Sequence, residues 1–175
     1  MPIQRLHHAA YRCKNAVETV KFYTELMELD YAMAAAEDRV PSVQEESPFM
    51  HIFFRMKDGG YVAFFELPTS PEMGRDENTP EWVQHLALSV ETEDEMMRFK
   101  SKLEKAGIDV LGPVDHKICK SIYFFDPNGH RLEIAYDTTT PDMAERLKEL
   151  ANPMLDEWAR TGKAPKDSNW NKEFA

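Results

Sequence analysis

A shortage of cysteine and of positive charge limits what this chain can be. Its 175 residues contain two cysteines, Cys13 and Cys119, which are far apart and form no CxxC motif. We interpret both as free thiols, which excludes a disulfide framework. The 21 basic residues are outnumbered by 31 acidic ones, and the formal net charge is −10. This charge argues against binding of nucleic acid or of an anionic membrane.

Long hydrophobic runs are also missing. No apolar stretch reaches the length of a membrane span, and the first residues lack the pattern of a signal peptide. We therefore expect a cytoplasmic protein. The apolar content of 42% supports a packed globule, and the length suits one domain, or two small modules that share a core.

What the sequence does contain is an internal repeat. Both His8 and His85 open an apolar stretch, and each is followed by a Phe fourteen residues later and a Leu eighteen residues later. Each half then closes on an apolar strand that carries one Glu, Glu66 in the first half and Glu133 in the second. A fixed offset seen twice predicts a duplicated unit. Two His and two Glu at equivalent places predict one metal site at a pseudo-two-fold axis.

The order of elements repeats as well, as βαβββ in each half, so the fold class is α+β. In the first half, residues 4–13, 31–36, 50–54 and 61–65 read as strands, 15–28 as a helix capped by Asn15, and 39–48 as a loop; Asp58-Gly59-Gly60 predicts a hairpin turn. In the second half the expected strands are 83–90, 108–111, 118–125 and 130–136, with a helix at about 92–106 that ends at Gly107. The chain then divides into module 1 (1–67), a linker (68–81), module 2 (82–137) and a C-terminal helical extension and tail (138–175), all in one structural domain.

The extension is expected to be helical from Asp142 to Ala159, with an interruption at Asn152-Pro153. Its apolar face should dock on the body of the protein or on a second copy. We therefore expect a homodimer. The last fifteen residues are polar and predict a mobile tail.

These residues resemble the vicinal oxygen chelate superfamily, which includes glyoxalase I, bleomycin-resistance proteins and type I extradiol dioxygenases. The resemblance covers about residues 4–136, and Gln84 to Val90 is very similar to the start of that family's second module. It implies a cupped mixed sheet around a metal. In the glyoxalase I pattern the ligands fall on His8, Glu66, His85 and Glu133, and Arg12 stands where glyoxalase I has a substrate-binding Arg.

A second resemblance starts at Val114-Asp115-His116, continues through Ile122 to Gly129 and ends at Glu133. This run looks like the signature of extradiol ring-cleavage dioxygenases. It implies that His116 and Tyr123 line the substrate pocket, with His8, His85 and Glu133 as the iron ligands. Glu66 counts against this, since a fourth ligand or catalytic carboxylate suits a glyoxalase-type lyase or isomerase. His130 is expected to be plain turn surface.

Our leading interpretation is a metal-dependent enzyme, a one-domain extradiol dioxygenase that cleaves a catecholic small molecule. The metal would be divalent, with Fe(II) favoured and Ni, Zn, Co or Mn as alternatives. The first alternative is a glyoxalase I-like lyase or isomerase with two His and two Glu ligands. The second is a protein that binds a small molecule, such as a drug, without catalysis.

Overall fold

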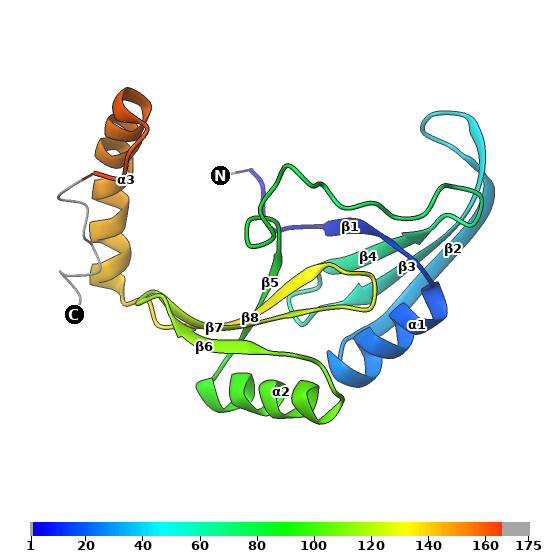
Figure 1. Ribbon diagram of the computed structural model, residues 1–175, viewed down its shortest axis with the longest axis horizontal. Helices are drawn as coiled ribbons and strands as arrows, with labels where there is room; N and C mark the ends of the chain where they lie inside the picture. The colour runs from blue at the N-terminus through cyan, green and yellow to red at the C-terminus, as the bar shows by residue number, and fades with distance from the viewer. Residues whose placement is uncertain (1, 166–175) are drawn as a thin grey trace.

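The computed structural model describes residues 2–165, which form two four-stranded mixed sheets and the helices that accompany them (Figure 1). The first sheet has the strand order β1-β4-β3-β2 and the second β5-β8-β7-β6. The bounds are β1 His8–Cys13, α1 Ala16–Lys21, η1 Phe22–Leu26, β2 Asp30–Val40, β3 Glu45–Arg55 and β4 Tyr61–Glu66, then β5 Leu86–Val90, α2 Glu93–Lys105, β6 Leu111–Asp115, β7 Cys119–Phe125, β8 Arg131–Asp137 and α3 Pro141–Thr161. The predicted α+β fold with two βαβββ units is confirmed.

Local sequence explains where the helices begin. Asn15 caps α1 by accepting a hydrogen bond from the backbone N–H of Glu18. Thr92 and Glu95 form a complete capping box at the start of α2, which satisfies two backbone donors that the helix itself leaves free. The predicted helix over 15–28 is divided: its second part, η1, is a π-helix.

One side of the sheets holds the core. In both modules the strand residues of one parity point toward the helices, among them Val62 and Phe64 in β4 and Leu132 and Ile134 in β8, all at most 1% exposed. They form a single cluster with residues of η1 and α2, so the two modules share one core. The residues of the other parity lie on the sheet face away from the helices, called here the open face. Both cysteines are free, as expected.

Two strands differ from expectation. The loop predicted at 39–48 is too long: only residues 41–44 form the turn, and β2 and β3 extend into the rest as a long hairpin with pairs such as Arg39–Glu46. Both sides of this hairpin are exposed, so it carries no hydrophobic alternation to reveal it, and Pro48 falls in a register shift, where its missing N–H does no harm. The strand expected at 108–111 lies instead at Leu111–Asp115 and includes Gly112-Pro113, a pair that normally argues against a strand.

The C-terminal helix also differs. The expected interruption at Asn152-Pro153 is absent, and α3 runs continuously through Pro153. It stands away from the two sheets (Figure 1). Met143 is buried, whereas Leu155 and Trp158 are 64% and 55% exposed, so most of its apolar face does not dock on the body. The predicted mobile tail extends into residues 166–175, which lie outside the described residues. None of the helices in residues 2–165 has the length and apolar character needed to cross a membrane.

Candidate metal and substrate site

The open face of module 2 carries a His–carboxylate pair. Strand alternation places Glu133 of β8 on this face, and His85 lies just before β5, the strand that pairs with β8. The Nε2 atom of His85 lies 3.0 Å from Oε2 of Glu133. Glu133 is 6% exposed and His85 is more accessible. A buried carboxylate beside an imidazole offers two of the donors that a divalent first-row metal prefers.

Ser121 holds the other carboxylate oxygen. Its hydroxyl donates a hydrogen bond to Oε1 of Glu133 from the neighbouring strand β7. The Ser121 side chain is fully buried, so the interaction fixes the carboxylate orientation in a site with little water. Sequence reasoning missed this residue. The available signal was its position two residues before Tyr123, which gives the two side chains the same strand parity.

Tyr123 and His116 contact each other beside this pair. Tyr123 pairs directly with Glu133 in the β7–β8 ladder. Its hydroxyl lies 2.8 Å from Nε2 of His116. Burial raises the pKa of the Tyr123 phenol above its ordinary value, while the Ser121 hydroxyl works in the opposite direction. The phenol is therefore protonated at neutral pH and can act as a hydrogen-bond donor.

Strand register corrects the sequence alignment of the two modules. In module 1 His8 pairs with Tyr61, two residues before Ala63. In module 2 Leu86 pairs with Leu132, which sets His85 opposite Arg131, two residues before Glu133. Ala63, and not Glu66, therefore occupies the position equivalent to Glu133. The repeat thus carries two histidines but one carboxylate at matching places.

Glu66 lies on the other side of its sheet. It shares the parity of the core residues Val62 and Phe64, and its Oε2 accepts a hydrogen bond from the backbone N–H of Ala16 at the start of α1. A carboxylate there complements the N-terminus of a helix. The structure does not bring Glu66 together with His85 and Glu133.

His8 is on the open face of module 1 and is exposed. Its ring contacts are His7, whose Nδ1 lies 2.8 Å from Nδ1 of His8, and Phe53, with ring centres 6.0 Å apart. Within residues 2–165 of a single chain no three His, Cys, Asp or Glu side chains are grouped closely enough to hold a metal ion. Within one chain, His85 and Glu133 therefore form a pair, and the third predicted ligand, His8, is not grouped with them.

The turn before β8 connects the two modules, and it corrects the expectation for His130. Nε2 of His130 donates to the backbone carbonyl of Arg12 at 2.6 Å, and its ring packs on Tyr11. His130 is therefore half-buried at the module contact and is not free turn surface. Arg12 itself donates to the carbonyl of Pro71 in the linker, so the linker is held against the end of β1.

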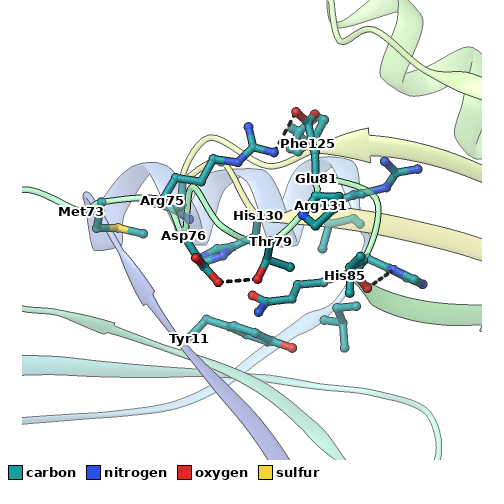
Figure 2. Close-up of a pocket in the computed structure, with 18 of the residues that line it drawn as sticks. Tyr11, Met73, Arg75, Asp76, Thr79, Glu81, His85, Phe125, His130 and Arg131 are labelled. Carbon is teal, nitrogen blue, oxygen red and sulfur yellow. Dashed lines mark hydrogen bonds and ion pairs between the residues drawn. The ribbon is translucent and has the colours of Figure 1, made fainter. Parts of the chain in front are cut away.

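A cleft of about 880 Å³ lies where the linker passes over β8 and β1 (Figure 2). His85 and Arg131 line one part of it, and His130 and Tyr11 line another. Arg75 and Glu81 of the linker also line it and form an ion pair of 2.7 Å. His85 is thus reachable from a space large enough for a small molecule.

Known proteins are similar to this chain in sequence and in fold. The sequence-family model of the Glyoxalase/Bleomycin resistance protein/Dioxygenase superfamily matches residues 5–134 of this chain. The metallothiol transferase FosB of Shouchella clausii (strain KSM-K16) is 33% identical over 96 residues, which are 47% of this chain and 64% of that protein. The chain thus spans less than two thirds of this curated relative.

Solved structures show the same fold at lower identity. A glyoxylase/bleomycin resistance protein/dioxygenase domain from Frankia sp. EAN1pec has a TM-score of 0.64 and 17% identity, covering 77% of this chain and 98% of that one. The fosfomycin resistance protein FosX of Listeria monocytogenes, solved as a variant with Mn(II) and 1S,2S-dihydroxypropylphosphonic acid, has a TM-score of 0.55 and 17% identity, covering 78% and 94%. With a family model that spans most of its length, this chain belongs to the Glyoxalase/Bleomycin resistance protein/Dioxygenase superfamily.

Proposed function

We propose that this protein is a metal-dependent enzyme that activates a small molecule through two neighbouring oxygen atoms, with a group-transfer reaction of the metallothiol-transferase type. The observation that carries the proposal is the His85–Glu133 pair, 3.0 Å apart and supported by the hydroxyl of Ser121. The similarity to the transferase FosB favours thiol transfer over the ring cleavage favoured by the sequence signature.

The metal ligands in this proposal are His85, Glu133 and the His8 of a second copy of the chain. His8 and His85 occupy matching strand positions. In this proposal a two-fold arrangement of two chains sets the open face of module 1 of one chain against the open face of module 2 of the other. Two imidazoles and one carboxylate leave coordination positions for a substrate. Glu66 is left out of the set, because its carboxylate is engaged at the start of α1.

The bound metal would polarise the substrate oxygens and stabilise the negative charge that develops on them. The protein's own residues orient and supply protons. Ser121 holds the Glu133 carboxylate in place. Tyr123, protonated and linked to His116, lies on the same face and can donate to an oxygen that gains charge. In thiol transfer the thiol loses its proton to solvent as its sulfur bonds to an electrophilic carbon, and the bond from that carbon to oxygen breaks. The released oxygen takes a proton from Tyr123, which regains one from solvent.

The metal in this proposal is a divalent ion of the Mn, Ni, Zn or Co type, with Mn(II) preferred since it is the ion named with FosX. Fe(II) belongs to the second candidate function, an extradiol dioxygenase. That candidate is supported by the 2.8 Å contact between His116 and Tyr123 and by Ala63, which leaves room where a fourth ligand would stand.

Mixing two inactive variants tests the shared metal site. His8→Ala and Glu133→Gln are each expected to lose tight Mn(II) binding. When the two are unfolded and refolded together, half of the dimers are mixed, and each mixed dimer contains one site with all three ligands. About a quarter of the sites should then bind metal, as a C2 assembly requires. No recovery, or full binding by His8→Ala alone, would contradict the shared site.

Two assays separate the candidate reactions. Loss of free thiol from cysteine or glutathione, in the presence of the Mn(II)-loaded protein and a panel of small electrophiles that carry two neighbouring oxygen atoms, is expected for the transferase. Oxygen uptake with a catechol panel and Fe(II) is expected for the dioxygenase. The His85→Ala protein is the control for both. Oxygen uptake without thiol loss would overturn the proposed reaction, and ligand binding with neither activity would favour a binding protein.

A further inference from the structure

Arg131 lies next to the candidate metal site, but it neither binds the metal nor supplies a proton in the proposed reaction. It begins β8, two residues before Glu133, so the two side chains share the open face. Its guanidinium lies over the ring of Tyr123, 4.6 Å from the ring centre. This stacking fixes the plane of the guanidinium beside His85 and Glu133.

Arg131 is also without an acidic partner. In a chain with ten more acidic than basic residues, most other arginines of the described part form ion pairs, such as Arg55 with Asp30 and Arg98 with Glu28. Arg131 forms no ion pair within residues 2–165, and its Nε is buried without a hydrogen-bond partner. A buried donor of this kind is destabilising unless something else accepts from it.

Only Nε of Arg131 is enclosed, so an acceptor can approach the terminal nitrogens of the guanidinium. The residue lines the 880 Å³ cleft described above. It also lines a second cleft of about 700 Å³, whose lining includes Tyr123 and Phe125 and the acidic residues Glu81, Glu104 and Asp109. Figure 2 shows its side chain at the edge of the first cleft near His85. The outer end of the guanidinium therefore borders open space, and the Tyr123 ring fixes its orientation.

We propose that Arg131 binds an anionic group of the substrate, a carboxylate or a phosphonate, and so makes this enzyme selective for acids. The planar guanidinium donates two parallel hydrogen bonds, which match either oxyanion. Tyr123 packs on one guanidinium face, which directs the bound group toward the remaining edge. The inference deepens the proposed function, since the acid would be carried by the molecule that the metal activates, but the binding of the anion needs no metal.

Small aromatic acids test this with the full-length protein in the presence of a chelator. Benzoate and phenylphosphonate are titrated by calorimetry, with benzamide as the uncharged control. Both acids are expected to bind more tightly than benzamide. Arg131→Gln should weaken the acids by about 10–100-fold and leave benzamide unchanged, whereas Arg131→Lys should show an intermediate loss. Arg160→Gln on the exposed side of α3 serves as the matched control and should bind like the parent.

Tighter binding of benzoate would indicate a carboxylate substrate, and tighter binding of phenylphosphonate would indicate a phosphonate substrate. Either result supports the proposal. Equal binding of benzamide and the acids, or acid affinities unchanged in Arg131→Gln, would overturn it. Thermal unfolding of each variant shows whether it is folded, and Arg131→Lys retains the test if the Gln variant is not. Because metal is absent, failure of anion binding does not bear on the metal site, and loss of metal binding in the ligand variants does not bear on Arg131.

Discussion

Removing the Ser121 hydroxyl should weaken metal binding without removing a ligand. In Ser121→Ala, Oε1 of Glu133 loses its donor while the pair with His85 remains. Partners that orient a metal ligand typically contribute 10–100-fold in affinity, which corresponds to roughly 1.4–2.7 kcal/mol. Ser121 is fully buried, so water cannot readily replace the lost hydroxyl, and we expect the upper half of this range.

Competition with a coloured chelator at constant pH measures this for Mn(II) and Zn(II). Ser89→Ala is the matched control: Ser89 lies on the same open face in β5 but is exposed, so its removal should leave the affinity unchanged. Glu133→Gln, which removes a ligand, should lose more than Ser121→Ala. If Ser121→Ala binds both metals as tightly as the parent while Glu133→Gln does not, the orientation argument is wrong.

Three further outcomes follow from the fold. Tyr23→Phe removes the hydroxyl that bonds buried Asp126 at 3.1 Å, and the free energy of unfolding in urea should fall by about 1.5–3 kcal/mol; a loss below about 0.5 kcal/mol would mean that this bond does not join the modules. Arg98 and then Lys102 lower the pKa of Glu28 to about 2, below the unfolded value, so its stabilisation exists above about pH 4.5 and is lost as the pH falls toward 2. Glu28→Gln should therefore destabilise by about 0.5–1 kcal/mol at neutral pH after allowance for solvent screening, and an equal difference from the parent at pH 3 would contradict this. Sedimentation at micromolar concentration should show a dimer, and replacing Leu155 and Trp158 of α3 with Ala should weaken it while leaving the unfolding of the body unchanged; a variant that dimerises like the parent would assign the contact elsewhere.

The sequence by itself determined the duplicated order of elements and the faces of most site residues. Helix starts at Asn15 and Thr92 follow from side chains that satisfy nearby backbone donors. The spacing from Tyr123 to Glu133 across a tight turn is local as well, because the turn fixes which residues of the two strands pair. For these reasons the hairpin of module 2 and the shared face of Tyr123 and Glu133 could be predicted.

Only the tertiary structure decided which carboxylate faces the site. β1 and β4 pair in parallel across a long connection, so nothing local fixes their register, and a short shift in alignment exchanges Glu66 for Ala63. The same holds for the contact of His130 with Arg12, which joins module 2 to module 1. The distance between such groups depends on how strands far apart in the sequence pair and pack, which the pattern along one strand does not contain.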